Sequence, residues 1–556
     1  MKIKFLLSLF LGSALSMSAQ GYLDGVEYYR ADQFNASKTV LERTLNDADT
    51  DKATSYYYLG QVAMEQGDKA LAKTYFEKGV EADAENPYNY VGLAALDLAN
   101  GDKKAADANV KKARSYGKKD AQLLVDVARV YFNADAVAYD KDIKKAMKDA
   151  LKANKESAAY YIFIGDTIAM NVQTNADAGE AAKNYDLAIY YDPNSAVAYV
   201  KYSNLYKNVN PQFSIQKMRE YIASNPNSAL ARRELANRLY DLGRWTQAVE
   251  AFEPVIKNPN HLIEDEERYA TILMSGERYE DAFNVAKGVI GRTETPNQMY
   301  RVMMHSKKTL KDYAEAAVWA KELMKSKGVA KIVDVDHLTY GSILEGLAAV
   351  DTANTATHYE AALAQYDEAL KENDKCYDAY KSKAALYSKM DDLANAVATF
   401  ELFMAAGEVK ANDYYTYAGH LSNYAVSVAK TDKEAAAPIF DKAIAATDEG
   451  VERSKSPYVQ ERKALILFAK NGSVTEEVVQ AFEGVVELLD ANPQYKSDKG
   501  TYKTALGQIG DYYLRANQNE KAIAAYERYL EFAPENTKVK ERVESLKAAV
   551  AEQQAQ

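Results

Sequence analysis

A few residues of this 556-residue chain have the types and spacing of metal ligands. Asp47, Asp49 and Asp51 alternate like the first ligands of a calcium-binding loop, since carboxylate oxygens are ligands that Ca²⁺ prefers. Such a loop then needs a glycine and a bidentate glutamate, and this chain has Lys52 and Tyr58 at those positions. We therefore interpret the three aspartates as part of a capped turn between helices.

A second polar cluster and the rare residue types give no better metal or catalytic site. Asp334, Asp336 and His337 fall close together, and we interpret them as the start of a helix. The only cysteine, Cys376, is interpreted as a small buried helical residue. The histidines do not have the paired spacing of a zinc site; they are His261, His305, His337, His358 and His420. The sequence predicts no metal, no cofactor and no catalytic residues.

Neither the sequence motifs nor the charge supports catalysis or nucleic-acid binding. The chain lacks a nucleophile elbow, a phosphate-binding loop of the GxxxxGK type and a dinucleotide-binding glycine pattern, so we predict that it is not an enzyme. Its net charge of −11 repels phosphates, which predicts no nucleic-acid partner.

The helices that would have to position any site recur at a fixed interval in the sequence. Within one unit, Tyr56, Leu59 and Ala63 share a helical face, and Gly67-Asp68 is suited to end one helix and cap the next. Tyr56, Leu59, Gly67, Asp68 and Ala72 recur 34 positions later as Tyr90, Leu93, Gly101, Asp102 and Ala106, and the spacing recurs at Trp245, Tyr279 and Tyr313. A fixed period of this length predicts a solenoid of two-helix repeats.

Two segments carry the pattern most clearly and resemble the tetratricopeptide repeat family. They are SYYYLGQVAMEQGDKALAKTYFEKGVEAD at 55–83 and TALGQIGDYYLRANQNEKAIAAYERYLEFAPEN at 504–536. The resemblance implies an all-α fold, an α-solenoid with a right-handed superhelix. By this template the chain holds about 14 helix-turn-helix repeats followed by a C-terminal capping helix.

The repeat pattern also gives a domain organisation. We expect an N-terminal array at 20–330, an irregular insertion within a repeat at 331–358, and a C-terminal array at 359–536. A capping helix and tail follow at 537–556, where Val539, Val543, Leu546 and Val550 form one apolar stripe.

In the tetratricopeptide family the first helix of each repeat, helix A, lines a concave groove that meets the ligand. Carried onto this sequence, the resemblance implies a polar, basic set of partner-binding residues in the repeats at 196–227 and 229–260. These are Lys201, Asn204, Lys207, Arg233, Asn237 and Tyr240. We weigh this set against ordinary solvated surface. In the repeats at 53–98 the same positions are apolar, as at Tyr57 and Met64, and bind a partner helix or line a tightly curved interior.

The N-terminal segment at 1–19 has the pattern of a secretory signal peptide. Lys2 and Lys4 precede an apolar run at 5–15, and Ser18 and Ala19 offer small residues for cleavage. No cysteine follows the run, so we expect an exported protein that is not a lipoprotein, cleaved near Ala19. The mature chain has no apolar stretch long enough to span a bilayer, and we expect it in the periplasm or at the outer membrane of a Gram-negative cell.

These features predict a non-enzymatic protein–protein interaction scaffold of the cell envelope, which docks partners along the concave groove. The expected partners are proteins or peptides, with outer-membrane and secretion components as the classes suggested by exported family members. The alternative is a soluble periplasmic protein that binds glycans or peptides. The sequence does not fix the oligomeric state.

Overall fold

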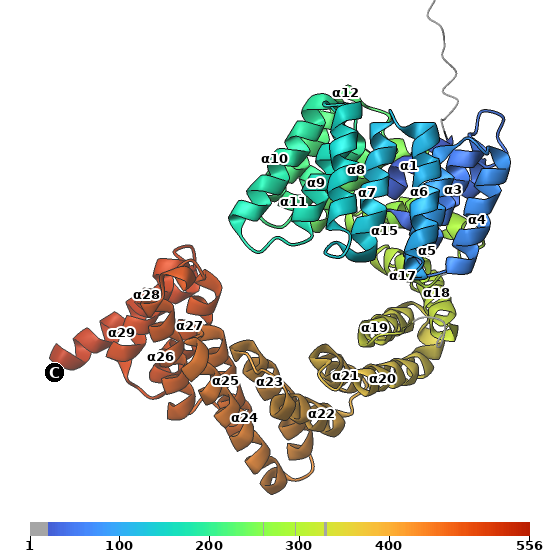
Figure 1. Cartoon of the computed structure of the whole chain (residues 1–556). Coiled ribbons are helices and arrows are strands. Elements are labelled where there is room, and N and C mark those ends of the chain that lie inside the picture. The colour runs from blue at the N-terminus through green and yellow to red at the C-terminus, as the bar shows by residue number, and fades with distance from the viewer. Residues whose placement is uncertain (1–20, 259–260, 295, 327–330, 556) are drawn as a thin grey trace, which may run out of the picture. The chain divides into compact units, whose positions relative to one another are not determined.

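The computed structural model describes residues 21–258, 261–294, 296–326 and 331–555 (Figure 1). Within these residues all regular secondary structure is helical, with α-helices numbered α1 to α29 and two short 3-10 helices. The helices form two compact units, which divide between Leu310 and Lys311. The prediction of an all-α solenoid is confirmed.

The first unit contains eight helix pairs, α1–α2 to α15–α16, followed by α17. The helices are α1 (Gly21–Arg30), α2 (Phe34–Thr44), α3 (Lys52–Glu65), α4 (Lys69–Ala82), α5 (Pro87–Ala99), α6 (Lys103–Gly117), α7 (Ala121–Asp135), α8 (Asp140–Ala153), α9 (Ala158–Ala169), α10 (Asn175–Tyr191), α11 (Ala196–Tyr206), α12 (Pro211–Ser224), α13 (Ala229–Asp241), α14 (Trp245–Lys257), α15 (Ile263–Ser275), α16 (Tyr279–Val289) and α17 (Asn297–Thr309).

The second unit begins with α18, continues with five helix pairs and ends with one further helix. The helices are α18 (Tyr313–Lys325), α19 (Asp334–Val350), α20 (Thr355–Glu372), α21 (Tyr377–Lys389), α22 (Leu393–Ala406), α23 (Ala411–Ala429), α24 (Lys433–Ser454), α25 (Pro457–Asn471), α26 (Glu476–Ala491), α27 (Lys499–Arg515), α28 (Asn519–Phe532) and α29 (Thr537–Ala555). The 3-10 helices, Thr352–Asn354 and Pro493–Tyr495, lie in connections of this unit.

The turn inside each repeat is built as its sequence predicts. Gly67 follows α3 with a φ of 80°, in the left-handed region that suits glycine, and Asp68 then caps α4 by accepting a hydrogen bond from the Leu71 amide at 2.9 Å. Gly101 repeats the same conformation in the next repeat, with a φ of 81°. The repeat in the sequence therefore corresponds to a repeated backbone conformation at the turn between the two helices.

Small residues on helix A receive large rings from helix B, the second helix of each repeat. Phe76 of α4 is fully buried, and its ring lies against both Gly60 of α3 and Gly92 of α5. A Cβ added to either glycine would come within 2.3 Å of the same ring carbon. The same pairing of a helix-A glycine with a helix-B aromatic ring recurs at Gly165 with Tyr185, Gly341 with Tyr366, and Gly510 with Tyr526.

The segment at 331–358 is more regular than expected. Residues 334–350 form the continuous helix α19, which pairs with α20 as the two helices of a repeat. Its N-terminus is stabilised because the Asp336 carboxylate accepts a hydrogen bond from the Val333 amide at 3.0 Å. The extra Thr, Asn and Ala residues form the short 3-10 helix Thr352–Asn354 and the start of α20, so the expectation of an irregular insertion is corrected.

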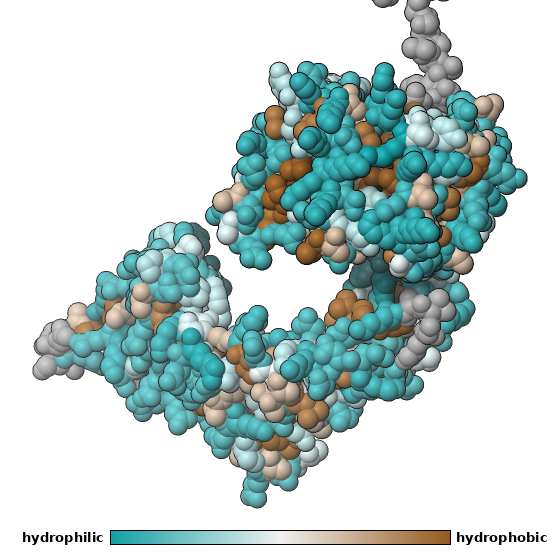
Figure 2. Space-filling view, in the orientation of Figure 1, coloured by the Kyte–Doolittle hydropathy of each residue, from teal (hydrophilic) through white to brown (hydrophobic). Residues whose placement is uncertain are grey.

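The C-terminal helix caps the array. Val543 and Leu546 of α29 are buried against Ala522 and Tyr526 of α28. The opposite face of α29 is exposed, which is what the open end of a solenoid needs to cover its last apolar surface. The faces visible in the space-filling view are mostly hydrophilic, with smaller apolar areas between the charged side chains (Figure 2).

Candidate partner-binding surfaces

Two of the predicted groove residues of the first unit, Lys201 and Arg233, contact the chain's own first helix pair. Lys201 on α11 donates a hydrogen bond to Asp32, which lies in the turn after α1, at 2.8 Å. Gln33 in the same turn donates to Glu234 of α13, also at 2.8 Å. These contacts join positions 169 and 201 apart in the sequence, so the first repeat reaches across to the sixth and seventh.

Arg233 is buried, whereas the prediction placed it at an exposed position of helix A. Its side chain donates two hydrogen bonds of 2.5 Å to the Asp265 carboxylate of α15, and the residue is only 7% exposed. The ring centre of Tyr28 from α1 lies 4.8 Å from the guanidinium carbon. Burial raises the pKa of Tyr28 to about 12, so its hydroxyl stays protonated at neutral pH. Arg233 therefore joins α13 and α15 to α1.

Lys201 belongs to a second charged cluster, centred on the buried residue Asp166 of α9. The Asp166 carboxylate accepts a hydrogen bond from the Tyr185 hydroxyl at 3.0 Å and one from Arg129 at 3.2 Å. The ammonium group of Lys201 is 3.3 Å from the same carboxylate. Each charged group in the cluster is next to an opposite charge or a hydrogen-bond partner. Ionised side chains can be buried only when they are paired in this way.

Arg238 is an interior residue that the sequence analysis missed. It donates to Asn204 at 2.6 Å and to Ser214 at 2.7 Å, and it pairs with Glu234 at 2.5 Å. Asn204, predicted to meet a ligand, therefore accepts a hydrogen bond from this arginine. The signal for Arg238 was its position four residues after Glu234 on one helical face.

The remaining polar groove residues are divided between a local cluster and solvent. Arg268 of α15 donates to Asn237 at 2.8 Å, and its guanidinium lies 4.2 Å from the ring centre of Tyr240. Lys207 is exposed at the end of α11. The structure thus brings Asn237 and Tyr240 together through Arg268 and leaves Lys207 in solvent.

The predicted apolar groove positions lie in the core that lines the interior. Tyr57 is buried, with its ring centre 4.8 Å from that of Tyr58 and 5.4 Å from that of Tyr88, and its hydroxyl accepts a hydrogen bond from Gln61 at 2.9 Å. Met64 is half-buried and packs against the same cluster. The sequence left two interpretations open, a surface for a partner helix or the lining of a curved interior. In the structure, Tyr57 and Met64 are part of a tightly packed interior.

The second unit presents a different helix-A surface. On α25, the side chains of Tyr458, Leu465 and Phe468 are 42%, 47% and 45% exposed. Next to them Arg462 lies over the ring of Tyr415 from α23, at 4.1 Å from its centre. The three exposed apolar residues lie on one side of α25, whereas Val459 and Ile466, each next in sequence to one of them, are buried. This helix-A surface of α25 was missed because, in the sequence, its apolar residues do not differ from those that pack in the core.

Comparison with known proteins identifies the repeat type. A family model described as tetratricopeptide repeat matches residues 53–86 and 504–536, which are α3–α4 and α27–α28. The chain is a tetratricopeptide repeat protein. No curated protein matches it.

Several solved structures are similar to this tetratricopeptide repeat protein at low identity. The C-terminal part of a TPR repeat-containing protein from Cytophaga hutchinsonii is 17% identical, with a TM-score of 0.41 over 50% of this chain and 98% of that one. Yeast Tom70 is 10% identical, with a TM-score of 0.31 over 74% and 96% of the two chains. The Cut9–Hcn1 complex of the APC/C gives 11% identity and a TM-score of 0.29 over 87% and 95%.

The polar residues first considered as metal ligands have structural roles in this tetratricopeptide repeat protein. Asp51 caps α3 by accepting a hydrogen bond from the Thr54 amide at 3.0 Å. His337 bonds to Gln365 at 2.9 Å, and Asp334 accepts a hydrogen bond from Asn373 at 2.6 Å. In the described parts of the chain, no three His, Cys, Asp or Glu side chains are grouped as a metal site.

Two further expectations concern membranes and export. No described helix is both long and apolar enough to cross a bilayer. The predicted signal peptide at 1–19 lies outside the described residues.

Proposed function

We propose that this protein is a non-enzymatic scaffold of the cell envelope that docks partner proteins or peptides on its helix-A surfaces. The tetratricopeptide fold supports protein binding as the general activity. Export to the periplasm or the outer membrane is part of the proposal and is supported by the charge and apolar pattern of the segment at 1–19. Outer-membrane or secretion proteins are the proposed partners.

The observation that carries the proposal is the exposed apolar face of α25. Leu465 and Phe468 follow Tyr458 by seven and ten positions, which places all three on one side of the helix. Large apolar side chains gathered on one exposed face indicate a surface that is covered by a partner. Arg462 and Tyr415 beside them supply a cation and an aromatic ring, residue types enriched where partners bind.

The first unit supports the same mechanism from within the chain. There, helix-A side chains hold a helix, α1, through the charge-assisted hydrogen bond from Lys201 to Asp32 and the contact of Arg233 with Tyr28. Helix-A residues of this protein thus bind a helical segment by combining charge pairs with aromatic packing.

The test is cross-linking affinity purification from native envelopes, with the partners identified by mass spectrometry. We compare the wild type with Leu465→Glu/Phe468→Glu. The matched control is Leu402→Glu on α22, a helix B of the same unit, whose side chain is 59% exposed. We expect a recurrent set of envelope proteins with the wild type and the control, and loss of that set with the double variant.

Two outcomes would contradict the proposal. Equal recovery of partners by the double variant and the wild type would exclude the α25 surface. A wild-type preparation without any protein partner would refute the scaffold and favour a soluble binder of glycans or peptides. Export is tested separately by N-terminal sequencing of the envelope fraction, which should find a chain that starts close to Gln20.

A further inference from the structure

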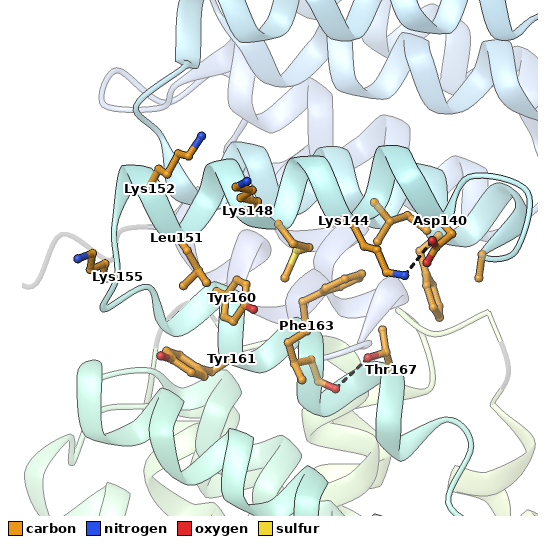
Figure 3. A pocket seen from close by; sticks show the side chains of 15 residues that line it. Asp140, Lys144, Lys148, Leu151, Lys152, Lys155, Tyr160, Tyr161, Phe163 and Thr167 are labelled. Atoms are coloured by element: carbon orange, nitrogen blue, oxygen red, sulfur yellow. Dashed lines mark hydrogen bonds and ion pairs between the residues drawn. The ribbon is translucent and has the colours of Figure 1, made fainter.

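A long groove runs between α8 and α9 of the first unit (Figure 3). Its volume is about 870 Å³, within the range of sites that enclose a ligand. The close-up shows Tyr160 and Phe163 of α9 on the side of α9 toward α8, with Leu151 of α8 beside Tyr160 and the labelled lysines along α8 and after its end. Lining residues extend from Asp140 at the start of α8 to Lys155 beyond its end.

The groove exists because α8 packs on one neighbour and stands away from the other. α8 packs extensively against α7 but contacts α9 at few positions, unlike the corresponding helices in most other repeats of this unit. The turn between α7 and α8 is also longer, at 136–139, where the turn between α3 and α4 takes only 66–68. The apolar side of α8 that faces α9 is therefore left partly uncovered.

Two parallel stripes run along α8 on the side of the groove. Ile143, Met147 and Leu151 recur at every fourth position and form the apolar floor with the α9 side chains. Each is followed directly by a lysine, at Lys144, Lys148 and Lys152, so that a row of ammonium groups borders the floor over about 12 Å of helix. Lys155 continues the row beyond the helix.

The lysine row is only partly neutralised by the protein itself. Lys144 pairs with Asp140 at 2.9 Å, and Lys152 lies 3.6 Å from Asp149. Lys148 and Lys155 are exposed and have no ion pair with any described residue. A basic rim is unusual on a chain with a net charge of −11, and it favours an acidic occupant.

We propose that the α8–α9 groove docks an acidic amphipathic helix of a partner protein. Such a helix would place its apolar side chains on the floor and its Glu or Asp side chains opposite the lysine row, a helix-in-groove arrangement. The length of α8, 14 residues or about 21 Å, matches a partner helix of about four turns.

The spacing of the charges decides between this occupant and simpler ones. A fatty acid carries one carboxylate, which a single lysine can pair, whereas four lysines spread along the groove match several negative charges on one rigid segment. The chain's own N-terminal segment at 1–19 does not fit, because its only charged side chains are Lys2 and Lys4, which the basic rim would repel.

An aromatic row extends the groove at the end near Lys155. The rings of Tyr160 and Tyr161 are 5.2 Å apart, Tyr161 stacks on Tyr191 of α10 at 5.3 Å, and Tyr191 contacts Tyr190 at 5.2 Å. Tyr190 is 76% exposed. This row offers apolar contact to partner residues beyond the helix end.

The α8–α9 groove is separate from the helix-A surface of α25 and can be tested without it. The probe is a fluorescent synthetic helix of the same length as α8, with leucines at i, i+4, i+7 and i+11, flanked by glutamates. Its binding to the purified full-length protein is measured by fluorescence anisotropy. Controls are a scrambled peptide of the same composition and the same helix with lysines in place of the glutamates.

We expect the acidic amphipathic peptide to bind and both control peptides to bind at least about tenfold more weakly. Lys148→Glu/Lys152→Glu should reduce affinity about tenfold or more, because two attractive contacts become repulsive. Lys104→Glu/Lys111→Glu, the same charge change at exposed positions of α6, should have little effect. All four positions are exposed, so folding is preserved.

The inference is overturned if the scrambled peptide binds as well as the amphipathic one, or if the two double variants lose affinity equally. If laurate binds and the acidic peptide does not, the proposed helix is wrong and the groove binds an anionic amphiphile instead. The outcome is independent of the scaffold proposal, which depends on the Leu465→Glu/Phe468→Glu comparison.

Discussion

Replacing Gly60 with alanine should destabilise the first unit, although alanine is normally the better helix former. A Cβ at Gly60 would lie 2.3 Å from Cε1, 2.5 Å from Cδ1 and 2.8 Å from Cζ of Phe76. Ordinary contacts between carbon atoms are about 3.5–4.0 Å, so the ring must retreat by about 1.2–1.7 Å. Phe76 is fully buried and also lies against Gly92, which leaves it little room to move.

The expected cost follows from this overpacking. Forcing an additional methyl group into a packed core costs about 1–3 kcal/mol, which outweighs the gain of about 0.5–1 kcal/mol from replacing a helical glycine. The first unit is larger than the domains for which 1 kcal/mol shifts the midpoint by about 2–4 °C, so the midpoint of thermal unfolding should fall by up to about 4 °C.

The assay is thermal unfolding followed by circular dichroism at 222 nm. The matched control is Gly179→Ala in α10, where an added Cβ has no neighbour within 4 Å and the substitution should raise the midpoint. In a double-mutant cycle, Phe76→Leu should relieve the cost of Gly60→Ala. A midpoint for Gly60→Ala at or above that of the wild type would refute the reasoning.

Three further predictions concern the first unit. Asp265→Asn leaves the buried charge of Arg233 without its partner, so the free energy of unfolding measured in urea should fall by about 3–5 kcal/mol. A fall of less than about 1 kcal/mol would contradict the role of this pair. Glu277 adopts a φ of 63°, which glycine tolerates better, so Glu277→Gly should stabilise the protein by up to about 1 kcal/mol. Gly67 has a φ of 80°, so Gly67→Ala should destabilise it. A change of the same sign for both variants would be inconsistent with backbone strain. Burial, and secondly the charge of the nearby Asp24, raises the pKa of Glu27 from 4.5 to about 7. The folded state therefore holds this proton more tightly than the unfolded state, and the stability of the protein should fall as the pH rises from about 4.5 to 7. Glu27→Gln should flatten this decline in midpoint against pH, and parallel profiles would show that Glu27 is not responsible.

The repeat fold could be predicted because each structural device is local. Gly67 and Asp68 end one helix and start the next through their own backbone and side chain, and both are visible in the sequence. The irregular stretch expected at 331–358 was wrong because residues 334–350 form a helix that Asp336 caps at its start. The extra Thr and Asn residues lie after this helix, in the short 3-10 helix Thr352–Asn354 and at the start of α20.

The site was harder to predict because it depends on contacts between distant repeats. Lys201 and Arg233 were predicted to meet a partner from helix A, and nothing local in the sequence reveals that Asp32 and Tyr28 of the same chain lie against them. The α8–α9 groove was missed for a related reason. The stripes at Ile143 and Lys144 are readable in the sequence, but the separation of α8 from α9 is a property of packing.

The contact of the first repeat with the sixth and seventh has a mechanical consequence. An ordinary solenoid touches only its nearest neighbours, so it stretches like a spring and can unravel from either end. In the first unit, the bonds from Gln33 to Glu234 and from Lys201 to Asp32 tie together segments that are 201 and 169 positions apart in the sequence. Pulled at its two ends, this unit should resist extension until that tie breaks, and then lengthen abruptly. Its repeats would thus extend together under force, whereas a solenoid held only by contacts between neighbours extends one repeat at a time.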